Sequence, residues 1–166
     1  MSKTRAGFTI MELMVVIAII GILAAISIPN MISWRLDRHY NDSLQTTIAI
    51  LHSTKTRAIK EQVDTAVIFN TVDHEINAYI LDEDGDWDEN DPIHTHEMGQ
   101  GVTLSIGTPN LFQLPDSSDH GIVFGPVGLP RMPASFNNGG SITLESSSRG
   151  LENDIEISIT GRINVL

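Results

Sequence analysis

Cysteine is absent from the 166 residues, so the fold contains no disulfide bonds and no thiolate can serve in a metal site. Positive charge is scarce, since ten lysines and arginines face 21 aspartates and glutamates and the formal net charge is −11. A chain this acidic repels nucleic acid and anionic lipid on average and favours cationic partners, metal ions included. The sequence also contains neither a Gly-x-Ser-x-Gly nucleophile elbow nor a Walker-type phosphate loop. We therefore expect no enzymatic activity.

Long apolar runs are missing after residue 29, but one such run lies at the N-terminus. As a helix, residues 8–28 would be about 31 Å long, which is enough to cross the hydrocarbon core of a bilayer. Lys3 and Arg5 precede the run with no acid between them, so we expect a cytoplasmic tip and a single-pass chain with its C-terminal bulk outside the cytoplasm. Glu12 is the charged residue inside the run, where a carboxylate costs several kcal/mol unless it finds a partner.

The stretch Gly7-Phe8-Thr9-Ile10-Met11-Glu12-Leu13, followed by an apolar helix, resembles the class III signal of type IV prepilins and type II secretion pseudopilins. The resemblance implies that a membrane peptidase cuts after Gly7 and N-methylates Phe8, and that Glu12 is the characteristic acid of this superfamily. Loss of the leader would remove Lys3 and Arg5 and take the net charge from −11 to −13. The expected parts are a prepilin leader (1–7), a transmembrane and filament-core helix (8–29) and a periplasmic pilin-like domain (30–166).

Cleavage after Gly7 would give the Glu12 carboxylate a partner. The new amine of Phe8 would then stand at the positive end of a helix dipole, and Glu12 lies one turn further in, where negative charge is favoured. In a bundle of such helices, Glu12 of one subunit can pair with the Phe8 amine of the next and set their register. Two other interpretations remain open: Glu12 stays solvated at the membrane interface, or Ala25-Ile26-Ser27 ends an ordinary secretory signal of a secreted enzyme.

Apolar spacing predicts the rest of the fold. Residues 32, 36, 40, 44, 48, 51 and 58 are apolar or aromatic at three- and four-residue spacing, which predicts an amphipathic helix that runs to about residue 62. Short β-branched runs follow at 65–70, 76–81, 102–106, 121–125, 141–145, 155–159 and 162–166, and residues 125–140 are typical of a loop. We expect an α+β, type IV pilin-like fold: a long N-terminal helix, half transmembrane and half amphipathic, packed against an antiparallel β-sheet domain of about seven strands.

Three later segments narrow the resemblance to the GspH/FimT branch of minor pseudopilins and minor pilins. They are an acidic turn at 81–88, a strand running into a Pro-Val-Gly turn at 122–128, and Thr160-Gly161-Arg162 before a final strand. The resemblance implies a structural subunit of a type II secretion pseudopilus, acting in protein secretion, or of a type IV pilus, which primes or caps assembly or presents a surface at the tip. Its implied partners are other pilins through the N-terminal helix, the prepilin peptidase and the inner-membrane assembly platform, with the C-terminal domain in the periplasm.

An acidic loop follows the second expected strand. Asp82, Asp84, Asp86 and Asp88 alternate along it, and alternating carboxylates can wrap oxygen ligands around Ca²⁺. The loop is not an EF-hand, because Gly85 is at the fourth place instead of the sixth and Ile93 stands where the final glutamate belongs. A calcium site built from these four aspartates and a solvated acidic tip both remain open, and no other cofactor is expected.

Two further groups of residues could bind a ligand. His94 and His96 would share one face of a strand and could chelate zinc, copper or nickel. In some relatives of the FimT kind a C-terminal Gly-Arg-x-Arg segment is linked to DNA binding, which makes a pilus DNA receptor the alternative function. Here Gly161-Arg162 is followed by Ile163-Asn164 and the second arginine is missing, so the sequence disfavours nucleic acid at Arg162. The structural interpretation is that Gly161 makes a tight turn and Arg162 is a charge on a sheet edge.

Overall fold

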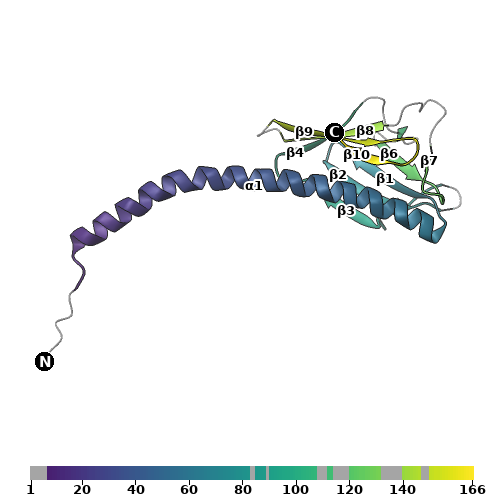
Figure 1. The fold of residues 1–166 in the computed structure, drawn as a ribbon. Helices are drawn as coiled ribbons and strands as arrows, with labels where there is room; N and C mark the ends of the chain where they lie inside the picture. The colour runs from purple at the N-terminus through teal and green to yellow at the C-terminus, as the bar shows by residue number, and fades with distance from the viewer. Residues whose placement is uncertain are drawn as a thin grey trace. The chain divides into compact units, whose positions relative to one another are not determined.

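A computed structural model describes residues 7–82, 85–88, 90–107, 112–113, 120–131, 140–146 and 150–166. The chain divides into two compact units, Met1–Leu36 and Asp37–Leu166. Helix α1 (Ile10–Glu61) begins in the first unit and ends in the second (Figure 1). In the described part of the first unit α1 is the sole regular element, and all the strands belong to the second unit.

The second half of α1 is amphipathic because its inward positions recur every three or four residues. Tyr40, Leu44, Leu51 and Ala58 are buried on this face as the spacing predicts. Two threonines fill the gaps in this stripe, at positions 47 and 54, where both are almost fully buried. The hydroxyl of Thr47 donates to the carbonyl of Ser43, one turn earlier, which satisfies that polar group inside the core.

The helix ends at Glu61, one residue before the expected end. Gln62 adopts a left-handed conformation, with φ of 58°, which stops the helical hydrogen-bond pattern. Its side-chain amide donates to the carbonyl of Ile59 at 2.7 Å and so satisfies one of the carbonyl groups left open at the helix end.

Two antiparallel sheets make up the remainder of the second unit. The first sheet has the strand order β3-β2-β1-β6-β5, with β7 also paired to β6, and the second has the order β10-β9-β8-β4. Their bounds are β1 (Thr65–Asn70), β2 (Glu75–Ile80), β3 (His94–Glu97), β4 (Val102–Ile106), β5 (Phe112–Gln113), β6 (His120–Phe124), β7 (Pro130–Arg131), β8 (Gly140–Ser146), β9 (Leu151–Ile157) and β10 (Ile163–Val165).

The expected architecture is confirmed, and three strands are added to the expected seven. Each of the seven predicted runs overlaps a strand, whereas β3, β5 and β7 were not predicted. Two of the added strands are only two residues long, and β7 lies inside the segment expected to be a loop. Strand β9 starts at Leu151 instead of residue 155, because polar residues occupy its first half and hide the apolar alternation. The expected loop beyond Arg131 lies outside the described residues up to position 139.

One hydrophobic core joins both sheets to the buried face of α1. Phe69, Ile76 and Phe124 of the first sheet are fully buried in it, as are Ile142 and Leu144 of the second. The prediction that the apolar strand faces cover the helix is therefore confirmed. Each such side chain stabilises the domain by about 1.5–3 kcal/mol relative to an exposed one.

Polar contacts also attach α1 to the sheets. The Tyr40 hydroxyl donates toward the carbonyl of Leu144 at 3.2 Å and the amide oxygen of Asn153 at 2.8 Å. Burial raises the pKa of Tyr40, and the nearby carboxylates of Glu152 and Asp154 add to that rise.

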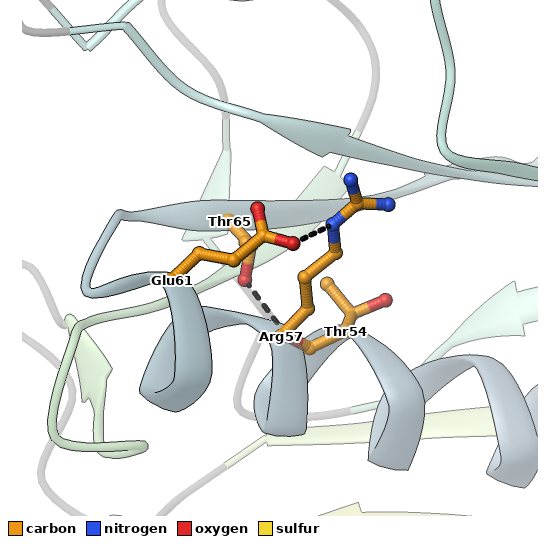
Figure 2. Close-up of polar contacts among 4 residues, drawn as sticks. All are labelled: Thr54, Arg57, Glu61 and Thr65. Atoms are coloured by element: carbon orange, nitrogen blue, oxygen red, sulfur yellow. Dashed lines mark hydrogen bonds and ion pairs between the residues drawn. The ribbon is translucent and has the colours of Figure 1, made fainter.

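Figure 2 shows the contacts at the other end of this half of α1. The Thr65 hydroxyl at the start of β1 donates to the carbonyl of Thr54 at 3.2 Å, in a buried setting. On the outer side, Arg57 and Glu61 form an exposed ion pair of 2.9 Å between successive turns, which contributes little to stability. The buried bond fixes where the chain leaves the helix and enters the first sheet.

Candidate processing and assembly site

The Gly7-Phe8 junction lies just before the start of α1. Residues 7–9 have no regular secondary structure, and the helix begins at Ile10. Gly7 is exposed, and 87% of the Phe8 surface is accessible. An exposed, non-helical segment is the form in which a backbone can enter a peptidase site, because no helical hydrogen bonds have to be broken first. The rest of the expected leader, residues 1–6, lies outside the described residues.

Glu12 closes a capping box with Thr9 at the start of α1. Its Oε2 accepts bonds from the Thr9 backbone N–H and hydroxyl, both at 3.0 Å, and the Glu12 N–H donates back to the Thr9 hydroxyl at 3.2 Å. The pattern Thr-x-x-Glu satisfies helix-end donors in both directions. The Thr9-x-x-Glu12 spacing is a sequence signal for this cap that the predictions above do not include. Both bonds go to Oε2, so Oε1 has no partner among the described residues and can still accept a bond from outside.

The first half of α1 exposes its apolar side chains. Large hydrophobic residues from Phe8 to Ile28 have between 45% and 87% of their surface accessible. By length and composition α1 is the one described helix that could cross a membrane. An exposed apolar surface of this extent is typical of a segment that is covered by lipid or by other helices.

Hydrogen bonds from backbone N–H groups to aspartate carboxylates hold the acidic loop in a turn. The N–H of Asp86 donates to Asp82 Oδ1 at 2.9 Å, and the N–H of Asn90 donates to Asp88 Oδ1 at 2.9 Å. Trp87 anchors the loop by packing on Tyr79, with ring centroids 6.3 Å apart. Among the described residues no group of three or more metal-binding side chains comes together, and Asp84 lies outside them. The calcium site stays a prediction, and the described geometry accounts for two of its carboxylates as turn-forming groups.

The histidine pair lies on β3, at an edge of the first sheet. His94 pairs with Ala78 and His96 with Ile76 of β2, so both side chains share one face as expected. Their surroundings differ, because His94 is exposed whereas the His96 Nε2 atom is buried and has no hydrogen-bond partner. The described part of the chain offers the pair no third histidine or carboxylate for a metal ion.

Two segments singled out in the sequence meet in space at the end of α1. The turn between β6 and β7 lies against Ile59, since a Cβ atom placed on Gly128 would be 2.6 Å from the Ile59 Cδ1 atom. The turn between β9 and β10 lies against the turn between β6 and β7, since a Cβ atom on Gly161 would be 2.7 Å from the carbonyl oxygen of Gly128. Lys55 Nζ donates to the carbonyl of Gly161 at 2.8 Å and ties both turns to the helix.

Gly161 and Arg162 have the local roles that the sequence indicates. Gly161 has φ of 72° and its N–H donates to the Ser158 carbonyl at 2.8 Å, which makes the tight turn before β10. Arg162 is exposed and precedes β10, the edge strand of the second sheet. This arginine is a surface charge next to the turn.

Comparison with known proteins supports the N-terminal motif. A family profile described as the prokaryotic N-terminal methylation motif matches residues 2–28. The type IV major pilin protein PilA of Myxococcus xanthus is 43% identical over 56 residues, which cover 34% of this chain and 25% of PilA. A fimbrial protein of Pseudomonas aeruginosa is 39% identical over 66 residues, 40% of this chain and 37% of that protein. The similarity thus spans well under half of each relative.

Solved structures resemble the chain over most of its length. The minor pseudopilin EpsH from the type 2 secretion system of Vibrio cholerae has a TM-score of 0.57 at 14% identity, covering 77% of this chain and 96% of EpsH. The type IV minor pilin FimU of Pseudomonas aeruginosa has a TM-score of 0.55 at 13% identity, covering 76% of this chain and 91% of FimU. The chain therefore combines a prokaryotic N-terminal methylation motif with a fold similar to that of EpsH and FimU.

Proposed function

We propose that this protein is a minor pilin or pseudopilin, a structural subunit that joins a type II secretion pseudopilus or a type IV pilus through its N-terminal helix. The observation that carries the proposal is the coexistence of two features. The methylation motif covers residues 2–28, and the globular part has the fold of minor subunits from both systems. Its role would be to prime or cap filament assembly or to present a surface at the tip, without catalysis.

Processing is the first step of the proposed function. A prepilin peptidase would cut the exposed junction between Gly7 and Phe8 and methylate the Phe8 amine. The chain would then remain anchored in the inner membrane by residues 8–29, with the domain from residue 30 onward in the periplasm. The inner-membrane assembly platform would draw it from there into the filament.

Glu12 would align neighbouring subunits in the filament core. In one chain its Oε2 is occupied by Thr9, which caps the helix. Its Oε1 would accept the Phe8 amine of an adjacent subunit, a pair whose misplacement leaves an uncompensated charge in an apolar core. The same carboxylate would therefore serve the helix end and the contact between subunits.

Mass spectrometry of the mature protein tests this proposal. Full-length protein expressed with a prepilin peptidase should begin with N-methylated Phe8, and its Gly7→Val variant should keep residues 1–7. A mature N-terminus near Ser27 would contradict the proposal, because it would identify an ordinary secretory signal. The sequence disfavours the DNA-receptor alternative, since Arg162 lacks a second arginine two residues later.

A further inference from the structure

The chain passes from the first sheet to the second through a short connection between β3 and β4. Residues 98–101, here called the crossover, follow β3 and precede β4, the last strand of the second sheet among the described residues. The Gly99 N–H donates to the Ser43 hydroxyl of α1 at 2.9 Å. A Cβ atom placed on Gly99 would lie 2.8 Å from the His39 Cβ atom, so the crossover passes close against the helix.

His74 bonds to both ends of this connection. Its carbonyl accepts the N–H of Met98 at 2.9 Å, where the crossover begins. Its Nδ1 atom accepts the N–H of Leu104 at 3.2 Å, just after the crossover ends. Leu104 belongs to β4, whose other side pairs with β8, so the His74 ring covers the outer edge of the second sheet. One residue of the first sheet therefore holds the place where the chain enters the second.

The backbone of His74 has an uncommon conformation. It is the last residue of the turn between β1 and β2, and its φ of 53° lies in the left-handed region. Asn70 fixes the other end of the turn, since its Oδ1 atom accepts the N–H groups of Val72 and Asp73 at 2.9 and 3.0 Å. Residues other than glycine keep such a conformation where surrounding contacts hold them, and they are frequent in switch regions.

The bond to Leu104 requires a neutral imidazole. A backbone N–H can only donate, so Nδ1 carries no proton and the single ring proton lies on Nε2. A second proton would turn Nδ1 into a donor that faces another donor, and the Leu104 N–H would lose its acceptor. His74 is partly exposed, so the charged ring can turn toward water without opening the hydrophobic core. Histidine is the side chain that gains its charge between pH 5 and 8.

Other titratable groups lie on the elements around His74. They are Asp73 and Glu75 on either side of it, His96 and Glu97 on β3, His39 on α1 and Glu145 on β8. The crossover and β4 contribute none. Aspartate and glutamate ordinarily keep their charge between about pH 5.5 and about pH 7.5, whereas histidine does not. The two neighbouring histidines therefore need their own controls.

We propose that His74 is a pH switch between the two sheets, in which protonation of the ring releases Leu104 and with it the edge of β4. The bonds that Met98 and Gly99 donate do not involve the ring, so they keep the crossover in place while the edge opens. An unpaired sheet edge can pair with a strand of another chain. The neutral form protects the second sheet from such pairing, and the protonated form exposes it. The switch lies within the globular domain and does not depend on the proposed filament role.

Hydrogen–deuterium exchange of the full-length protein in detergent micelles, read by mass spectrometry, tests the switch. Labelling is done at about pH 7.5 and about pH 5.5, with times scaled to the intrinsic exchange rate at each pH. After this scaling, peptides that cover Val102–Ile106 should exchange roughly tenfold faster at the lower pH, because the released N–H is no longer protected. Peptides from Thr65–Asn70 should exchange equally at both, which separates local opening from unfolding of the domain.

Two substitutions separate the proton from the bond. Asparagine tolerates the left-handed conformation, and its Oδ1 atom can accept in place of Nδ1 without titrating, so His74→Asn should keep β4 protected at both pH values. Glycine adopts the same φ but has no acceptor, so His74→Gly should leave β4 unprotected at both. The matched controls His39→Gln and His96→Asn should keep the response of the unchanged protein.

Several results would overturn the proposal. They are equal protection of β4 at both pH values in the unchanged protein, an acid-induced loss that persists in His74→Asn, and full protection in His74→Gly. A response that disappears in His39→Gln or His96→Asn would assign it to that histidine instead. Loss of protection in β1 at the lower pH would show that the whole domain unfolds, which also contradicts a switch confined to β4.

Discussion

Replacing Gly161 by alanine should destabilise the globular domain for two reasons that can be measured separately. The residue has φ of 72°, a conformation that costs an alanine roughly 1–2 kcal/mol. The new Cβ atom would also lie 2.7 Å from the carbonyl oxygen of Gly128, a backbone atom that cannot turn away. Overpacking of this kind adds about 1–3 kcal/mol. We therefore expect Gly161→Ala to lower the free energy of unfolding by roughly 2–5 kcal/mol in total.

Gly150→Ala is the matched control. Gly150 has a similar φ of 61°, but no described atom lies within 4 Å of the position its Cβ would take. This variant should lose only the conformational part, roughly 1–2 kcal/mol. The difference between the two variants then measures the contact of the last turn with the turn between β6 and β7.

Urea unfolding of a fragment that starts at Asp37 supplies the assay, because the hydrophobic core lies entirely within the second unit. Trp87 is then the sole tryptophan and reports through its fluorescence. With a slope of about 2 kcal/mol per molar urea, the Gly161→Ala midpoint should fall roughly 0.5–1.5 M below that of Gly150→Ala. Equal midpoints with equal slopes would refute the close approach of the two turns.

Three other perturbations have definite expected outcomes. Glu12→Ala should leave membrane insertion intact but reduce N-methylation or filament entry, measured by mass spectrometry and filament purification, whereas Thr9→Ala, which removes only the cap, should reduce them less. The raised pKa of Tyr40 means that the folded domain holds the phenol proton more tightly than the unfolded chain, so the stabilisation that Tyr40 contributes should be constant below pH 10 and fall above it. Tyr40→Phe should flatten that fall in urea midpoints and lower stability at neutral pH by about 1–3 kcal/mol. If Asp82, Asp84, Asp86 and Asp88 bind calcium, about 10 mM CaCl₂ should add roughly 1.5–3 kcal/mol to thermal stability, and equal MgCl₂ should not.

Each of these three has an outcome that contradicts it. Normal filament levels of Glu12→Ala would remove the charge pair between subunits. A Tyr40→Phe variant with the same decline above pH 10 would assign the decline to another group. An unchanged thermal midpoint with calcium would leave the loop as a solvated acidic tip.

Periodicity predicted the elements that bury a face. The stripe through Tyr40, Leu44 and Leu51 indicated the amphipathic helix, and alternating runs such as Val102–Ile106 indicated strands, because both patterns come directly from core burial. Strand β3, with the sequence His-Thr-His-Glu, has no apolar residue and no such pattern. It forms because β2 offers an edge to pair with, which is a property of the sheet and not of the segment.

The candidate site was predictable only where its parts are close in sequence. Gly7, Phe8 and Glu12 form a local motif, and the bond between Thr9 and Glu12 was also visible as a Thr-x-x-Glu pattern. The approach of Gly161 to Gly128 depends on the order of strands in two sheets, which local patterns do not specify. Local patterns also do not predict the role of His74, a turn residue with φ of 53°. Its Nδ1 atom accepts a hydrogen bond from the N–H of Leu104 at 3.2 Å, and this bond links the two sheets.

The bonds that fasten the end of the chain to α1 also set the order in which the domain can fold. Lys55 is separated from its acceptor Gly161 by 106 positions, and Tyr40 from Asn153 by 113. Contacts this distant in sequence form slowly, because a long loop must close before they contribute to stability. Neither bond exists until the last strand pair has been synthesised, so α1 emerges long before its covering sheet is complete. The part of α1 that these two bonds attach therefore stays incompletely covered until the last two strands have formed.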